Sequence, residues 1–518
     1  MSTHFAEAGN VTERLINYYA NRARGGAAML VTEPMGMLHW QKAPTRPQVF
    51  GGRNGDALRR WAEAVAAEGS FLLGQIQDNG RGARTGVRNP DAYGASPLPD
   101  DLSWTVPYAL PTDGVRRMID EFVESCGALQ AAGFAGIEIS AGHGHIFHQF
   151  LSIRANRRQD CYGGDLEGRV RLLVELIIGI RQFCGPDFLI GVKLPAEDGL
   201  KDGIDLEQAA AITERVHATG QIDYLTYCWG AHAWTLYEHL PDLHGPRAPY
   251  LDKIQALGKF APGVPLGALG LITDPNEGER IVRDGVADLV MLGRPLVTEA
   301  AWGLKASQGR EAQIRYCVSC NTCWHMITTG SGLKCDNNPR VGEYDEADWR
   351  PKTAQRRRKV VVVGAGIAGM EAAWVAAARG HDVTLFGASE EGGGKTRLHA
   401  ELPGGENLSS IYDYQMLAMR RYGVRAFWGK KAVIADILDQ KPDVVVLATG
   451  SVLTWPDFIT DDYRDEEFFP NLRTAVARFS RTKARQTGQA VIYDYDQSAF
   501  TYAAAELLNR RFERVTIL

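Results

Sequence analysis

The chain has 518 residues, which is too long for one hydrophobic core and suits roughly two to four domains. Apolar residues make up 45% of it and charged residues 23%, and no apolar run of about 18 residues offers a membrane span. The net charge of -5 gives no basic surface for nucleic acid, so we expect a small-molecule substrate and no membrane partner.

The first part of the chain has the alternation of a parallel α/β fold, with short apolar runs between amphipathic helical segments such as 114–132 and 165–183. A closed (β/α)8 TIM barrel needs eight strands, and residues 11–25 already read as the helix that follows the first one. We therefore predict a barrel over residues 1–310 whose first strand would precede Met1, because of an internal start codon or deliberate shortening. Seven strands are predicted, at 27–34, 71–76, 136–140, 188–194, 223–228, 265–269 and 287–293.

A cysteine segment over 311–345 and a charged linker follow the barrel. Residues 359–386 then read as strand, glycine turn, helix and strand, and 442–450 reads as a later strand of the same sheet. A second βαβ unit starts at 489 and reaches the last residue, 518. We predict a Rossmann-like FAD/NAD(P)-type domain over 355–518 that is incomplete at its C-terminus.

The cysteines are unevenly distributed. Residues 1–9 carry no secretory leader, so we expect a cytoplasmic protein, in which crowded cysteines favour metal over disulfides. Three thiols within seven positions and a fourth after eleven intervening residues suit a 4Fe–4S cluster, while a closed tetrahedral zinc site is the alternative. The predicted ligands are Cys317, Cys320, Cys323 and Cys335, whereas Cys126, Cys161, Cys184 and Cys228 are scattered.

A glycine turn opens the last domain. Gly364, Gly366 and Gly369 form G-x-G-x-x-G between an apolar strand and a helix, where backbone can approach a pyrophosphate. FAD or ADP is the expected ligand. The acidic residue that would bind the ribose is replaced by Gly387, so either a nearby glutamate, Glu390 or Glu391, takes its place or the domain binds nothing.

The active face of a TIM barrel lies at the carboxyl ends of its strands, where the region 80–112 is expected as a long loop. We favour hydrogen-bonding or proton-transfer roles for His143 and His145 over a metal site completed by His148, since no carboxylate partner is evident. Ordinary core or loop packing is the alternative for each histidine. The candidates at strand ends are Glu33, Gln75, His143, His145, Lys193 and Arg294.

The last two barrel strands are followed by residues that suit a phosphate. Gly270 and Gly293 permit close backbone approach, and the guanidinium of Arg294 adds a bidentate charge. We expect the phosphate of FMN there.

The motifs are VTERLINYYANRARGG, GQIQDNGR, HQFLSIRANRRQDCYGGDLEGRVRLL, ADLVMLGRPLV, YCVSCNTC with KCDNNP, and VVVVGAGIAGMEAA. In this order they resemble the Old Yellow Enzyme class, in the branch that contains 2,4-dienoyl-CoA reductase and trimethylamine dehydrogenase. The resemblance implies that Thr3 faces the flavin O4 edge, Gln75 the pyrimidine ring, and Lys193 the N1 and O2 region in place of an arginine. It also implies non-covalent FMN, because no cysteine stands near Thr3.

The resemblance places His145 where ene reductases of this class carry a tyrosine proton donor, which disfavours ene reduction. Amine oxidation needs no such acid, and CVSCNTCW and HLPDLHGPRAPYLD look similar to segments of demethylases that act on N-methylproline and related amino acids. Trp229, Trp234, Tyr237 and Glu238 either enclose a cationic amine or simply pack their loop.

Three functions stay open at this point. The first is FMN- and 4Fe–4S-dependent oxidative demethylation of a small amine such as N-methylproline or dimethylglycine, with an electron-transfer flavoprotein as acceptor. The second is NAD(P)H-dependent ene reduction, although residues 489–518 lack the G-x-G-x-x-G of a nicotinamide site. The third is a non-catalytic electron-relay protein. We expect a homo-oligomer.

Overall fold

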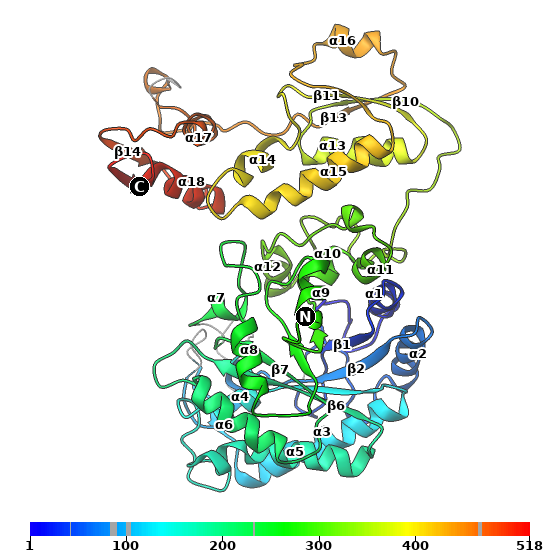
Figure 1. The fold of residues 1–518 in the computed structure, drawn as a ribbon, viewed down its shortest axis with the longest axis vertical. Coiled ribbons are helices and arrows are strands. Elements are labelled where there is room, and N and C mark those ends of the chain that lie inside the picture. The colour runs from blue at the N-terminus through cyan, green and yellow to red at the C-terminus, as the bar shows by residue number, and fades with distance from the viewer. Residues whose placement is uncertain (42, 83–90, 100–104, 232–233, 465–468) are drawn as a thin grey trace. The chain divides into compact units, whose positions relative to one another are not determined.

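The computed structural model describes residues 1–41, 43–82, 91–99, 105–231, 234–464 and 469–518 (Figure 1). The chain divides into two compact units, and each has its own main parallel sheet. The first unit comprises Met1–Asp242, Pro246–Glu311 and Ser319–Asp348, and the second comprises Leu243–Gly245, Ala312–Val318 and Trp349–Leu518.

The first unit is built on a curled sheet of seven parallel strands, which follow one another in the sheet as they do in the chain. All seven predicted strands are confirmed, and so is the TIM-barrel class of the fold. In the described residues β1 and β9 are the two edges of this sheet. The strands are β1 (Met29–Pro34), β2 (Phe71–Ile76), β5 (Gly136–Ser140), β6 (Leu189–Glu197), β7 (Tyr224–Trp229), β8 (Leu266–Ala268) and β9 (Leu289–Val290).

Residues 1–3 lie between the carboxyl ends of these two edge strands. The backbone amide of Thr3 donates to the carboxylate of Glu33 on β1. A Cβ added to Gly293, just after β9, would lie 3.3 Å from Sδ of Met1.

Helices alternate with the strands along the chain. Side-chain caps begin several of them: Thr12 accepts from the amide of Leu15, and Asp165 accepts from that of Gly168. The longer helices are α1 (Glu13–Arg24), α2 (Gly55–Ala66), α3 (Thr112–Ala131), α5 (Leu166–Cys184), α6 (Leu206–His217), α8 (Leu251–Gly258) and α9 (Pro275–Arg283). The shorter ones are α4 (Ile146–Leu151), α7 (Leu236–His239), α10 (Arg294–Thr298), α11 (Trp302–Ser307) and α12 (Thr322–Thr328).

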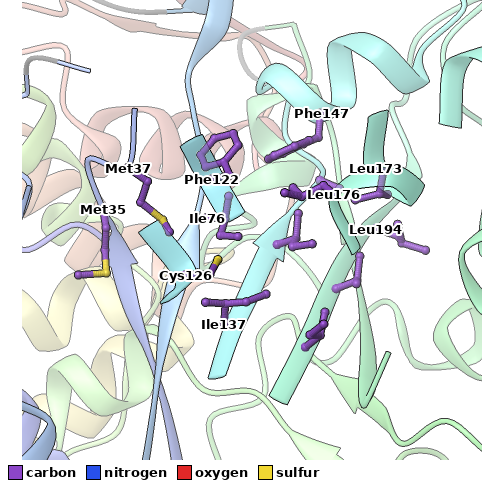
Figure 2. Close-up of a cluster of buried hydrophobic side chains, with 14 of the residues drawn as sticks. Met35, Met37, Ile76, Phe122, Cys126, Ile137, Phe147, Leu173, Leu176 and Leu194 are labelled. Carbon is purple, nitrogen blue, oxygen red and sulfur yellow. The ribbon is translucent and has the colours of Figure 1, made fainter. Parts of the chain in front are cut away.

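The core of the first unit lies between the sheet and these helices (Figure 2). Phe122 and Cys126 on α3 pack in one cluster with Ile76 on β2 and Ile137 on β5, and all four side chains are fully buried. Burial of one large apolar side chain contributes about 1.5–3 kcal/mol, so this layer fixes the strands firmly. Polar side chains at the carboxyl ends of the strands are therefore held on a rigid support.

The region 80–112 was predicted as a loop. Two short strands in it, β3 (Tyr93–Gly94) and β4 (Tyr108–Ala109), pair with each other, and residues 83–90 and 100–104 lie outside the described residues.

The second unit contains a four-stranded parallel sheet in the order β12-β11-β10-β13, with an additional parallel pair, β14 and β15. This is the predicted Rossmann-like topology. Its strands are β10 (Lys359–Val363), β11 (Asp382–Phe386), β12 (Arg425–Phe427), β13 (Val444–Leu447), β14 (Gln489–Ile492) and β15 (Arg514–Ile517). Its helices are α13 (Ile367–Ala378), α14 (Gly394–Ala400), α15 (Ser409–Arg421), α16 (Ile434–Asp439), α17 (Leu472–Arg481) and α18 (Ala499–Asn509). In the described part of the chain, no helix has both the length and the apolar character that crossing a membrane requires.

Candidate functional site

A buried carboxylate, Glu138 on β5, connects polar residues from neighbouring strands. Its Oε1 lies 2.9 Å from Nζ of Lys193 on β6 and accepts a hydrogen bond of 3.0 Å from Nε2 of Gln75 on β2. Its Oε2 accepts a hydrogen bond of 3.1 Å from the hydroxyl of Tyr224 on β7. Two predicted flavin ligands, Gln75 and Lys193, are thus brought together by a residue that the sequence analysis missed.

The two charges of this network, on Glu138 and Lys193, each stabilise the ionised form of the other. Burial by itself disfavours both ions, but the attraction of Glu138 raises the pKa of Lys193 above its usual value. Lys193 and the hydrogen bonds from Gln75 and Tyr224 outweigh the burial of Glu138 and lower the pKa of that carboxyl. The site therefore contains a permanent cation at neutral pH, as a group facing the electron-rich edge of a flavin requires.

The predicted proton carrier His143 follows β5 in a left-handed backbone conformation, with φ of 59°. Its ring stacks on that of His239, with centroids 3.7 Å apart, and the centroid of His145 lies 6.4 Å away. Burial, then the charges of His239 and Lys193, lower the pKa of His143 well below its usual value. His143 is therefore a neutral imidazole at neutral pH.

His148 has a different role from its neighbours. The backbone amide of Gly144 donates to its Nδ1 at 2.7 Å, and its Nε2 lies 2.8 Å from the carboxylate of Asp198. These bonds use both ring nitrogens and fix the loop that carries His143 and His145. No group of three or more His, Cys, Asp or Glu side chains is arranged to hold a metal ion in the part of the chain that the structure describes.

The predicted phosphate-binding residues follow β8 and β9, which are paired strands. Gly270 has φ of 103°, and a Cβ there would lie 2.7 Å from Cδ2 of Tyr250, so this position requires glycine. Among the described residues, Nη1 is the one guanidinium nitrogen of Arg294 that donates hydrogen bonds, to the carbonyl of Pro241 at 2.8 Å and to Oδ1 of Asn321 at 2.5 Å. Its Nε and Nη2 make no hydrogen bond within the described residues.

The aromatic residues at the end of β7 and in the segment after it differ in their exposure. Trp229 is buried and stacks on Tyr250, with centroids 4.0 Å apart, and the Tyr250 hydroxyl donates to Glu238. Trp234 and Tyr237 are exposed. Loop packing therefore accounts for Trp229, and the exposed pair stays a candidate for substrate contact.

Near residues 1–3, Glu33 is fully buried, and this burial raises the pKa of its carboxyl to about 7. Thr3 is also fully buried, and its backbone carbonyl accepts from the amide of Leu333. The structure thus places Thr3 and Glu33 at the strand ends. The charge of Lys193 reaches this region, because it helps to lower the pKa of the N-terminal amino group of Met1.

None of the four clustered cysteines forms a disulfide within the residues that the structure describes. Cys320, Cys323 and Cys335 belong to the first unit, with Cys323 on α12 and Sγ of Cys335 at 3.5 Å from Oγ1 of Thr298. Cys317 lies three residues before Cys320, in a segment counted with the second unit. In a cubane each thiolate binds a different iron, so the sulfurs need not converge on one point. Four cysteines on one short segment, none of them in a disulfide, fit such a cluster.

Left-handed residues alternate with the cysteines in this segment, at Ser319 with φ of 57° and at Asn321 with φ of 60°. Such residues curl the backbone so that its amides can face an anionic group, as in many iron–sulfur sites.

In the second unit the glycine turn is shaped for a pyrophosphate. A Cβ at Gly364 would lie 2.1 Å from the carbonyl oxygen of Ala448, and one at Gly369 would lie 1.9 Å from that of Gly364. Gly366, at the start of α13, faces open space. The three glycines therefore fit the phosphates of a dinucleotide.

The ribose side of this site differs from the usual pattern. A Cβ at Gly387 would lie 2.8 Å from that of Ala365, so the missing acid could not simply be restored. Glu391 pairs with Arg397 at 3.2 Å, and the carboxylate of Glu390 lies against Gly429. Neither glutamate is therefore placed as an evident substitute.

A barrel sheet with a buried cation and an amide at its strand ends fits a flavin-dependent oxidoreductase, and the comparison with protein families shows that the chain is one. It belongs to the NADH:flavin oxidoreductase / NADH oxidase family, whose model matches residues 2–313. A second model, described as FAD dependent oxidoreductase, matches residues 359–509. The resemblance inferred from the motifs is confirmed. FMN in the first unit and FAD in the second are the cofactors that these families imply.

The chain is 32% identical over 467 residues to NADH oxidase of Thermoanaerobacter brockii, covering 87% of this chain and 70% of that protein. It is 31% identical over 458 residues to the probable N-methylproline demethylase of Rhizobium meliloti strain 1021, covering 86% of this chain and 66% of that protein. The chain thus spans about two thirds of the length of these relatives. The solved structure of a 2-naphthoyl-CoA reductase complex has the same fold, with a TM-score of 0.88 at 24% identity over 99% of this chain and 79% of that chain.

Proposed function

We propose that this flavin-dependent oxidoreductase oxidises a small N-methylated amine or amino acid, using FMN in the first unit and a 4Fe–4S cluster at the four clustered cysteines. The substrate carbon loses a hydride, and water adds to the resulting iminium. Formaldehyde and the demethylated amine are the products. When bound, FMN supplies the hydride acceptor and the cluster a path for single electrons.

The position of His143 is the observation that carries this proposal. Its ring follows β5 at the strand ends, stacks on His239 with centroids 3.7 Å apart and lies near His145, and its lowered pKa keeps it neutral. An amine must be unprotonated before its carbon can be oxidised, and oxidation leaves a positive charge on the iminium. A neutral imidazole can accept a hydrogen bond from the N–H of an incoming ammonium and, unlike an imidazolium, places no positive charge beside the iminium. Ene reduction needs a proton donor instead, and His145 stands where ene reductases of this class carry a tyrosine.

The remaining site residues take the roles that the family resemblance implies, and their contacts support those roles. Lys193, held by Glu138, would face the N1 and O2 edge of FMN, and Gln75 would face its pyrimidine ring. Thr3 would lie at the O4 edge. His145 would orient the substrate beside His143. Gly270, Gly293 and Arg294 would bind the FMN phosphate.

An anaerobic titration tests the proposal. N-methylproline or dimethylglycine should bleach the flavin absorbance of the purified protein and release formaldehyde, while NADPH should leave the flavin oxidised. Iron and acid-labile sulfide should be present at about four atoms each per chain. Bleaching by NADPH and not by either amine would rule out the demethylase.

The second candidate is NAD(P)H-dependent reduction of an activated alkene, with His145 as the proton donor. It is supported by the similarity to an NADH oxidase. The same titration separates the candidates, because rapid bleaching by NADPH followed by reoxidation with a dienoyl-CoA ester would favour the reductase. A preparation without flavin absorbance would favour the non-catalytic relay protein instead.

We also propose an electron-transfer flavoprotein as the acceptor and a homo-oligomeric assembly. Analytical ultracentrifugation with and without the flavoprotein would test both.

A further inference from the structure

One side chain, that of Asn321, connects the loop after β9 with the cysteine segment. Its Oδ1 accepts a hydrogen bond of 2.5 Å from Nη1 of Arg294, and its Nδ2 donates to the carbonyl of Leu240 at 3.1 Å. The same Nη1 donates to the carbonyl of Pro241 at 2.8 Å. All four residues belong to the first unit.

These contacts fix the orientation of the guanidinium. The group is planar and rigid, so anchoring Nη1 to two oxygens sets the direction in which the opposite edge points. That edge, with Nε and Nη2, makes no hydrogen bond within the described residues of the protein. It is therefore available for a bidentate interaction with an anion.

We propose that Asn321 is a positioning residue for the FMN phosphate, which it serves by orienting Arg294. The inference rests on the proposed function in one respect, namely that FMN binds at Arg294. It assigns to the cysteine segment a task besides holding a cluster, because Asn321 stands between Cys320 and Cys323.

The backbone of Asn321 determines which variant is informative. Its φ of 60° lies in the left-handed region, which asparagine and glycine tolerate and alanine does not. Asn321→Gly therefore removes the amide and leaves the loop unstrained. Asn54 is a matched control, since it also has a left-handed φ, of 63°, and its side-chain amide also donates to backbone carbonyls, those of Gly9 and Gln48. Among the described residues it bonds neither Arg294 nor a cysteine.

The test compares FMN with riboflavin, which lacks the phosphate. We expect Asn321→Gly to weaken FMN binding about tenfold, as measured by flavin fluorescence, and to leave riboflavin binding unchanged. Asn54→Gly should change neither affinity. In an Arg294→Ala background, Asn321→Gly should have no further effect on FMN, since it acts through the arginine.

Three results would overturn the inference, and they differ in what else they exclude. If the wild-type protein binds FMN and Asn321→Gly binds it equally well, only the role of Asn321 is wrong. If the wild-type protein binds neither flavin, the proposed function fails together with the role of Asn321. Equal weakening for FMN and riboflavin would show a general disturbance of the site and would also exclude a role at the phosphate.

Discussion

The polar residues at the strand ends depend on one another for their ionisation states. Lys193 is a cation because Glu138 lies 2.9 Å away, and Glu138 stays ionised because Lys193, Gln75 and Tyr224 all bond to it. The positive charge of Lys193 in turn helps to keep His143 neutral. Glu138 therefore influences both the group expected at the flavin and the group expected at the substrate.

Removing the charge of Glu138 should destabilise the protein strongly. Glu138→Gln keeps hydrogen-bonding atoms for Gln75 and Tyr224 but leaves the ammonium of Lys193 buried without a counter-ion. We expect a loss of about 3–5 kcal/mol in the free energy of unfolding, measured by chemical denaturation. The exposed pair of Asp56 and Arg59 is the control, because Asp56→Asn should cost less than about 1 kcal/mol. Equal losses in the free energy of unfolding for both variants would show that Glu138 does not serve as the counter-ion of Lys193.

The lowered pKa of His143 predicts a pH dependence of stability. Below its unfolded pKa of about 6.5, His143 binds a proton in the unfolded chain but not in the folded one, so acid favours unfolding. His143→Gln removes this effect. The free energy of unfolding of the wild type, relative to the variant, should thus fall by up to about 1.4 kcal/mol per pH unit below about pH 6.5 and stay constant above it. A constant difference across that range would show that His143 is not held neutral.

At the scale of single residues, part of the candidate site could be predicted from the sequence. Gln75, Lys193 and His143 were found because side chains after parallel strands share one edge of the sheet. Glu138 lies inside an apolar strand, GIEIS, and was missed. A lone carboxylate in such a run could have identified it as a functional candidate. His239 was not predictable in this way, because it reaches His143 from a distant helix, α7.

Among the elements, the strands were the easiest to predict. Strands of a parallel sheet are covered on both faces, so they read as continuous apolar runs between turns, and all seven of the first unit appear where expected. β3 and β4 were missed because two-residue strands carry no periodicity. The pairing of the cysteine segment with other parts of the chain could not be predicted either, since it depends on side-chain contacts such as that of Thr298 with Cys335.

The glycine turn before α13 allows an element-level prediction. Gly366 has an ordinary φ of -75° and faces open space, so Gly366→Ala should fold normally but place a methyl group where the pyrophosphate is expected. We expect at least about tenfold weaker binding of FAD or ADP by calorimetry, with an unchanged melting temperature. Gly369→Ala is the contrasting variant, since its Cβ would lie 1.9 Å from the carbonyl oxygen of Gly364 and should destabilise the unit. Undiminished nucleotide binding by Gly366→Ala would place the ligand elsewhere.

At the scale of the whole molecule, two oxidoreductase modules share one chain, matched over residues 2–313 and 359–509. The cysteine segment falls largely between the two matches, from Cys317 to Cys335. One of its residues, Asn321, nevertheless bonds to Arg294 within the first module. The binding of a cluster by the cysteine segment and the binding of FMN at Arg294 should therefore influence each other.

This connection predicts that iron and FMN stabilise each other. A cluster on Cys320 and Cys323 would hold the loop that carries Asn321, and Asn321 orients Arg294, so removing iron should loosen the phosphate contact. We expect anaerobic chelation of iron to weaken FMN binding several-fold, on the order of 1 kcal/mol, in the wild type. In the Arg294→Ala variant, removal of iron should not change the affinity for FMN. By linkage, added FMN should also slow iron loss from the wild type but not from that variant. Equal FMN affinities with and without iron in the wild type would show that the loop keeps its shape by packing alone, independently of any metal.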